Sequence, residues 1–427
     1  MITLKNDELA FSFPELGLSL RPFIEEYSQA TLPCLVAEDR RAVIEKLHAD
    51  WCFREASRER QTQAEKRVLS AGAEEIEDVF HRVSTAAVKD YVDCGLQICF
   101  QRTLRIPDDG RTYPLPAGLG LFPLHDIDEF QQSVPPLWLE RGGVLMPMYQ
   151  SEALWIYFHT GYPFAVKVGA GKINAVTGES FGEDLASSPQ NYLVVPGQPW
   201  LDGFAVSKGV IRQFVAMPLG AGYSAEEQLT GKAEVGGLQL QAFPMKPAVC
   251  FQKVIKDRLP KSLGDLLREW TRDILRLPGY NYLLDMLFGS SLGGAMGLGA
   301  GGKMQQEIYA DPYGIDDWDL SQSRRCFVHL CNSMQWRQIT GNYPPHPPLT
   351  ASEYKKHRIP WFDYYRDDLQ ALDGSPILEK LKSVRQWGKI KGDQPLPEEA
   401  SVQPELVIQF GTARRPKEVR EWALLAG

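Results

Sequence analysis

Residues 203–217 read GFAVSKGVIRQFVAM, two runs rich in β-branched and aromatic residues on either side of Ser207-Lys208-Gly209. Runs of this composition are typical of β-strands, and a short connection that contains glycine is typical of a hairpin. Residues 164–176, FAVKVGAGKINAV, show the same arrangement around Gly169-Ala170-Gly171. The sequence therefore predicts two hairpins, and with them an antiparallel sheet, in the middle of the chain.

Apolar runs of strand length continue on both sides of these hairpins. They lie at 96–106, 143–149, 153–159, 238–243 and 326–332. Short strands at such spacing are typical of a sandwich or a barrel. Residues 37–57 and 73–92 instead carry apolar residues at helical spacing. We therefore predict an α+β fold with an antiparallel β-sandwich or barrel-like core, a helical N-terminal insert and a mixed C-terminal region.

These changes of periodicity divide the 427 residues into three regions. Residues 1–95 are expected to form a short strand followed by the helical insert, and residues 96–250 the β-rich core domain. Residues 251–427 are expected to mix helices and strands with a glycine-rich and an acidic loop. Helices are predicted there at 262–277 and at 416–425.

The composition has an acidic balance, with a net charge of −8 at pH 7. Because nucleic-acid binding needs basic patches that neutralise phosphates, this balance argues against a nucleic-acid partner. The seven cysteines form no CxxC pair, which is typical of free thiols in a reducing compartment. No secretory signal is visible at the N-terminus, so we expect a cytoplasmic protein.

An uncharged, glycine-rich run, MLFGSSLGGAMGLGAGG, occupies residues 286–302. Glycine removes side chains where the backbone must approach another group, so we expect this run to face a ligand or a partner. It is shorter than the about 20 apolar residues that span a membrane, which leaves membrane-surface association as a minor alternative. Residues 297–303 fit the spacing GxxxxGK, but Met304 replaces the hydroxyl residue of a phosphate loop. Lys303 is a candidate ligand-binding residue, and a packed loop is the alternative.

An acidic loop, DPYGIDDWD, follows at residues 311–319. Clustered carboxylates suit Ca²⁺ or Mg²⁺, so Asp311, Asp316 and Asp319 are candidate metal ligands. Crowded carboxylates also shift one another's pKa values, which makes Asp316 and Asp317 candidate catalytic acids or bases. The alternative for all four aspartates is the chemistry of turns and helix caps.

Two polar residues lie on predicted apolar strands. His329 shares a strand face with Cys331, so it is a candidate catalytic residue or metal ligand, and a buried core histidine is the alternative. Arg212 needs an ion-pair partner on such a strand, or it binds the carboxylate of a substrate. Glu226 or Glu227 is the expected structural partner.

Trp361 and Tyr364 belong to an aromatic segment, WFDYYRDD, that is interleaved with aspartates. Aromatic side chains mixed with acids line sites for carbohydrates and for cationic ligands. Trp361 and Tyr364 are therefore candidate ligand-binding residues. The alternative is that the segment anchors the C-terminal region to the core.

Several phrases together resemble a protein family found in bacteria and fungi. They are FQRTLRIPDDGRTYPLPAGLGLFPL, MPMYQSEALWIYF, YPFAVKVGAGKINAVTGES, PWLDGFAVSKGVIRQFVAMPLGAGYSAEEQLTG and GLGAGGKMQQEIYADPYGIDDWD. Some members of this family carry the label "integral membrane protein". The resemblance covers residues 98–385, and it implies neither an activity nor a cofactor. The helical segment 35–95 does not belong to the pattern of the family, which implies an insertion.

Two functional classes follow from these observations. The first is a binding or assembly protein that presents the glycine-rich run to a small molecule, to a protein partner or to a second copy of the chain. The second is a hydrolase or transferase that uses the acidic loop, with or without a divalent metal. If the second class is correct, we expect a pocket in which at least two of the aspartates converge with His329, Arg212 or Lys303.

Overall fold

The computed structural model describes residues 1–427 except 51–52, 55, 93, 268–293, 343–346, 349, 358, 367, 394–403, 405 and 412–427. The predicted helix at 416–425 and most of the one at 262–277 lie outside the described residues. The same is true of residues 286–293, the first part of the glycine-rich run.

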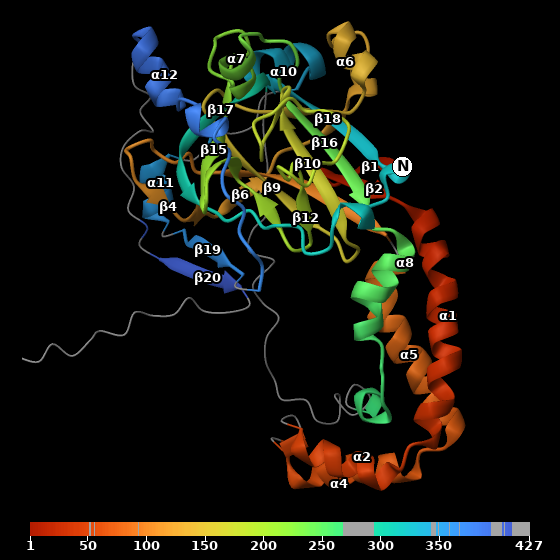
Figure 1. The fold of residues 1–427 in the computed structure, drawn as a ribbon. Helices are drawn as coiled ribbons and strands as arrows, with labels where there is room; N and C mark the ends of the chain where they lie inside the picture. Colours follow the sequence, from red (N-terminus) through yellow and green to blue (C-terminus); the bar gives the residue numbers. More distant parts are fainter. Residues whose placement is uncertain are drawn as a thin grey trace, which may run out of the picture.

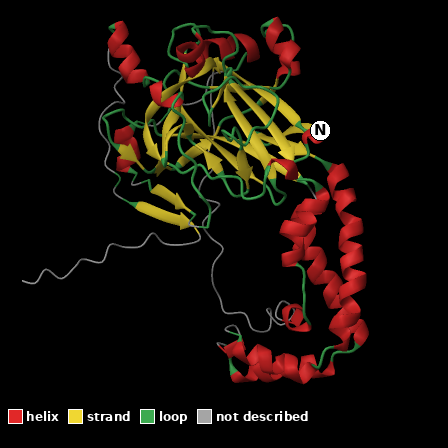
Figure 2. Cartoon of the chain, in the orientation of Figure 1, coloured by secondary structure: helices red, strands yellow, loops and turns green. Residues whose placement is uncertain are grey.

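The described residues form an α+β fold, in which a large and mostly antiparallel sheet carries a group of N-terminal helices at one side (Figures 1 and 2). Among these residues, 17 strands form the large sheet and three form a small one. The predicted class, with its antiparallel β core and N-terminal helices, is confirmed.

The strands alternate with turns along most of the chain. In the large sheet they are β1 (Ile2–Lys5), β2 (Glu8–Ser12), β3 (Gly95–Thr103), β4 (Thr112–Tyr113), β6 (Gly118–Leu121), β7 (His125–Asp126), β8 (Val144–Pro147), β9 (Ala153–His159), β10 (Phe164–Ala170), β11 (Ile173–Asn174), β12 (Leu193–Val195), β13 (Trp200–Leu201), β14 (Gly203–Ser207), β15 (Val210–Met217), β16 (Leu238–Pro244), β17 (Gly294–Gln305) and β18 (Arg324–Asn332). The small sheet contains β5 (Leu115–Pro116), β19 (Trp361–Tyr365) and β20 (Val407–Gly411).

Both predicted hairpins are present. β10 and β11 pair around Gly171, which has a positive φ of 57°. β14 and β15 pair around Gly209, with a φ of 69°. Glycine adopts this left-handed conformation without the steric penalty that a side chain brings, which is why the turns form there.

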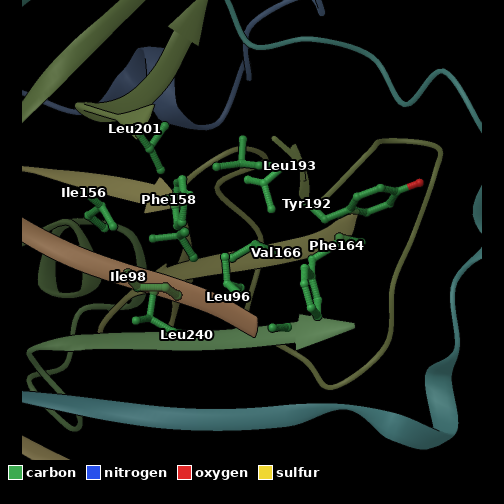
Figure 3. Packing of buried hydrophobic residues seen from close by; sticks show 14 of the residues in the cluster. Leu96, Ile98, Ile156, Phe158, Phe164, Val166, Tyr192, Leu193, Leu201 and Leu240 are labelled. Carbon is green, nitrogen blue, oxygen red and sulfur yellow. The ribbon is translucent and has the colours of Figure 1, made fainter. Parts of the chain in front are cut away.

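The hydrophobic core lies between two parts of the large sheet. β3 and β9 contribute Leu96, Ile98 and Phe158 from one part, and β10 and β16 contribute Val166 and Leu240 from the other (Figure 3). We call this core the sheet cluster, and it also contains apolar residues of α1 and α5. Residues from all three regions of the sequence belong to the sheet cluster. Each region therefore contributes to the burial of the apolar sheet faces.

The helices fall into an N-terminal group and short pieces between strands. The first group, which we call the helical arm, comprises α1 (Pro14–Ala37), α2 (Arg40–Ala49), α4 (Arg58–Ser70) and α5 (Ala73–Val92). The others are α6 (Pro136–Arg141), α7 (Ala225–Thr230), α8 (Pro247–Cys250), η2 (Phe251–Ile255), η3 (Lys256–Arg258), α10 (Ser333–Thr340), α11 (Ala351–Lys356) and α12 (Val384–Lys391). Besides η3, the described residues contain single turns of 3-10 helix at η1 (Ile127–Phe130), η5 (Ile315–Asp317), η6 (Leu320–Gln322) and η7 (Leu378–Lys380).

The helical arm extends away from the sheet (Figure 1). α1 and α5 pack side by side next to the sheet, whereas α2 and α4 lie at the far end. There, Val43, Leu47, Val68 and Phe80 belong to a second hydrophobic core, the arm cluster. The helical periodicity of residues 37–92 therefore predicted this part correctly.

The glycine-rich run was predicted to be a loop, and its described part is instead a β-strand. Its described part forms β17, which pairs with β15 along most of its length and with β18 at its start. Residues 296–300 are buried. Arg212 pairs with Lys303 and Phe214 with Ala300, so two glycines lie opposite one residue and form a β-bulge. The described part of the run is thus interior sheet and not an exposed loop.

No helix in the part of the chain that the structure describes is long and apolar enough to cross a membrane.

Candidate functional site

A cleft of about 530 Å³ opens where the helical arm meets the sheet. α5 contributes Ala86, Ala87 and Tyr91 to one wall, and η2 and η3 contribute Val254 and Arg258. The sheet side is formed by Thr160, Gly161 and Pro163 between β9 and β10 and by residues 194–197 at the end of β12. The third side is closed by Tyr309, Ala310, Pro312 and Tyr313 from one segment and by Arg366 and Leu369 from another. The volume is in the range of pockets that hold small organic ligands.

The described lining of the cleft carries charge of one sign. Its charged side chains are those of Arg258 and Arg366, and this part of the lining contains no aspartate or glutamate. The guanidinium of Arg258 lies 5.4 Å from the centre of the Tyr91 ring. Arg366 forms two hydrogen bonds with Asp368, one of them a 2.9 Å contact from Nε to Oδ1. The cleft is therefore positive in a chain whose net charge is −8.

Tyrosine hydroxyls provide most of the other polar groups of the cleft. Burial raises the pKa of Tyr313, and the positive charges of Arg258 and Arg366 act in the opposite direction. Burial also raises the pKa of Tyr309, whose hydroxyl accepts a 2.9 Å hydrogen bond from the backbone N–H of Arg366. Both hydroxyls are therefore neutral hydrogen-bonding groups near pH 7.

The start of the acidic loop holds Tyr313 in place. Oδ2 of Asp311 accepts hydrogen bonds from the Tyr192 hydroxyl at 2.6 Å and from Nε1 of Trp318 at 2.8 Å. Oδ1 of Asp311 accepts a hydrogen bond from the backbone N–H of Tyr313 at 2.8 Å. Both carboxylate oxygens of Asp311 are therefore engaged by Tyr192, Tyr313 and Trp318. Asp311 does not line the cleft itself, but its hydrogen bonds fix the position of Tyr313, which does.

The other aspartates of the acidic loop do not join Asp311. Asp317 forms a 2.5 Å ion pair with Lys253. Asp319 accepts hydrogen bonds from Ser321 and caps the short helix η6. Asp316 is exposed at the surface. Within the described residues no group of three or more histidine, cysteine, aspartate or glutamate side chains is arranged to hold a metal ion.

His329 lies on β18, where it is buried and packed against another ring. Its Nε2 atom is 2.9 Å from the carbonyl oxygen of Gly142, and its ring stacks on Trp138 with centroids 4.9 Å apart. Burial lowers the pKa of His329 to about 4, so the ring is neutral near pH 7. The structure places it beside α6 and not beside Asp316 or Asp317.

Arg212 and Lys303 are neighbours on β15 and β17. Arg212 forms an ion pair of 3.4 Å with Asp108 and donates a 3.1 Å hydrogen bond to the carbonyl oxygen of Gly301. The expected partners are otherwise engaged: Glu226 accepts hydrogen bonds from the backbone of residues 235–236, and Glu227 closes the capping box of α7. The prediction of a Glu226 or Glu227 partner was therefore wrong. Asp108 belongs to Pro107-Asp108-Asp109-Gly110, whose composition indicates only a turn.

The aromatic segment of β19 has two different environments. Trp361 is buried in a cluster with Tyr113 and Tyr354, on the far side of β15 from the sheet cluster. The ring of Tyr364 lies 6.4 Å from that of Tyr309, which lines the cleft. Tyr364 therefore supports a cleft wall, whereas Trp361 belongs to separate packing.

The chain matches no model of a protein family, no curated protein and no solved structure.

Sequence reasoning missed most of the cleft. Arg258, Tyr91 and Tyr309 were not singled out, because each lies in a segment whose local pattern indicates only a helix or a loop. One signal was present for Arg258: Asp257 and Lys261 have the i, i+4 spacing of an ion pair, which leaves Arg258 without its nearest acid. In the structure that pair forms at 2.6 Å.

Proposed function

We propose that this protein binds a small organic molecule in the cleft between the helical arm and the sheet. The observation that carries the proposal is the composition of the described lining: three tyrosines, two arginines and no carboxylate around a volume of about 530 Å³. A pocket with apolar and aromatic walls and a few converging polar groups is the usual form of a small-molecule site.

The same geometry favours binding over catalysis. A hydrolytic site needs a nucleophile or an activated water, a base and an orienting group within hydrogen-bond reach of one another. The candidate groups from the sequence are instead distributed: Asp317 pairs with Lys253, and His329 lies beside Gly142. The described lining of the cleft offers tyrosine and arginine side chains, which bind and orient ligands.

Filling the cleft from one wall tests this function. Ala87 is half-buried on α5 and lines the cleft, so Ala87→Phe places an aromatic ring there. We expect this variant to weaken binding of a neutral fluorescent probe, phenylnaphthylamine, by about tenfold. Probe affinity is measured by fluorescence titration of the full chain. Thr85→Phe is the matched control, because Thr85 is exposed on the same helix and does not line the cleft.

The two variants separate the possible results. Binding that is lost in Ala87→Phe and kept in Thr85→Phe, with equal thermal midpoints, supports a ligand site in the cleft. Equal affinities in both variants and the unchanged protein show that the probe binds elsewhere, and an absence of binding to the unchanged protein contradicts the proposal as well.

A further inference from the structure

We infer that the ligand of this cleft is an organic monoanion, whose charged group pairs with Arg258 and whose apolar body lies along the tyrosine walls. The inference rests on the proposed function and adds the chemical class of the ligand. It follows from the state of the two arginines, from the charge of the lining and from the shape of the apolar walls.

In the described lining of the cleft, Arg258 is the cation without a carboxylate partner. It ends η3, lines the cleft, is exposed, and stacks its guanidinium on the Tyr91 ring. Among the described residues no carboxylate pairs with it, since its neighbour Asp257 is held by Lys261. A guanidinium offers two parallel N–H groups, which match the oxygens of a carboxylate, sulfonate or phosphate.

Arg366 differs from Arg258 in its charge balance. Nε of Arg366 donates a hydrogen bond to Oδ1 of Asp368, and Nη2 donates one to Oδ2. The pair is close to neutral as seen from the cleft, so it contributes hydrogen-bonding capacity and little net charge. One uncompensated positive charge therefore remains in the described lining, which matches a ligand with one negative charge.

The remaining walls suit an apolar or aromatic body. Ala87, Val254 and Pro312 line the cleft with apolar side chains, and the half-buried Tyr313 adds an aromatic side chain. An anion without such a body would leave these walls in contact with water. A ligand that carries both parts buries apolar area and satisfies Arg258 at the same time.

Two probes with nearly the same body test the charge requirement. Anilinonaphthalene sulfonate carries one negative charge, and phenylnaphthylamine is its uncharged counterpart. We expect the full chain to bind the sulfonate about five- to tenfold more tightly, because a charge-assisted pair with a guanidinium is stronger than a neutral hydrogen bond. Added salt should weaken the binding of the sulfonate and leave the neutral probe unchanged.

The matched variants are Arg258→Gln and Lys256→Gln. Lys256 is an exposed lysine of the same short helix that does not line the cleft. We expect Arg258→Gln to reduce sulfonate affinity about five- to tenfold, to the level of the neutral probe, and Lys256→Gln to change neither. Thermal midpoints of the variants check that each one is folded.

The results distinguish this inference from the function on which it rests. If Ala87→Phe blocks both probes while Arg258→Gln changes neither, the cleft is a ligand site and the monoanion inference is wrong. If Ala87→Phe leaves both probes bound, the proposed function fails. If Lys256→Gln lowers sulfonate affinity as much as Arg258→Gln, the sulfonate responds to surface charge in general, and the inference is overturned.

Discussion

Replacing Gly302 by alanine is expected to lower the free energy of unfolding by about 3 kcal/mol. A Cβ atom at this position would lie 2.5 Å from the carbonyl oxygen of Pro107 and 2.7 Å from that of Ile106. Both contacts are to backbone, which cannot rotate away as a side chain does. The φ of Gly302 is not positive, so the loss would come from lack of space alone.

Chemical denaturation of the Gly302→Ala variant and of the unchanged protein measures this difference in the free energy of unfolding. Gly182→Ala is the control, because a Cβ atom there meets nothing within 4 Å and the residue has no positive φ. We expect the control to keep the stability of the unchanged chain. A Gly302→Ala variant as stable as the control would mean that residues 106–107 do not cross β17 as closely as described.

Replacing Asp202 by asparagine is expected to stabilise the protein, and more so at higher pH. Asp202 is 1% exposed, and neither of its carboxylate oxygens has a hydrogen-bond partner among the described residues. Burial raises its pKa well above the usual value, so the folded protein holds a proton that the unfolded chain releases above about pH 3.9. The stability of the unchanged protein therefore falls as pH rises above that value, until the folded-state pKa is passed.

Asparagine has nearly the same shape and no charge to bury, so it removes this dependence. The difference in unfolding free energy between the variant and the unchanged protein should grow by about 1.4 kcal/mol for each pH unit within that range. Denaturation at pH 5, 6 and 7 measures the slope. Taking the difference is necessary because burial also raises the pKa of Glu152 to about 7, which adds a slope of its own in both proteins.

Asp373→Asn is the control for this series, since the side chain of Asp373 is 93% exposed. Its stability difference should not depend on pH. A difference for Asp202→Asn that stays constant from pH 5 to pH 7 would contradict the prediction, because the carboxylate would then have the same proton occupancy in the folded and unfolded chains.

Local signals in the sequence predicted the elements that depend on local chemistry. The two hairpins follow from glycine at Gly171 and Gly209. The spacings from Ser224 to Glu227 and from Thr350 to Glu353 are those of a capping box, and capping boxes form there in α7 and α11. Such features are set by residues a few positions apart, so their spacing can be recognised without a structure.

Helix α1 is an element for which the sequence analysis made no prediction over most of its length. It continues from Pro14 to Ala37 although it contains Pro22 and Pro33, which ordinarily end or kink a helix. Packing against α5 and against Phe251 overrides that preference, since Phe23 stacks on Phe251 with ring centroids 5.7 Å apart. A contact between residues so far apart in the chain leaves no local pattern.

The candidate site was missed for the same reason. Tyr91, Arg258 and Tyr313 meet in one cleft although more than fifty residues separate each from the next. The sequence singled out the acidic loop, and that loop does border the cleft, but Tyr313 lines it whereas Asp311 holds the loop from behind. Predicting this arrangement requires the sheet topology, which residue spacing alone does not contain.

The sheet cluster and the arm cluster are separate hydrophobic cores, which implies that the sheet and the far end of the arm are two cooperative units. Among the described residues, Tyr27 is the one side chain that packs against both the sheet cluster and the arm cluster. Cooperative unfolding is transmitted through shared apolar contacts, so the far end of the arm can open while the sheet stays folded. Amide protons of α2 and α4 would then exchange with solvent through local opening, whereas those of β9 and β10 require the whole sheet to unfold.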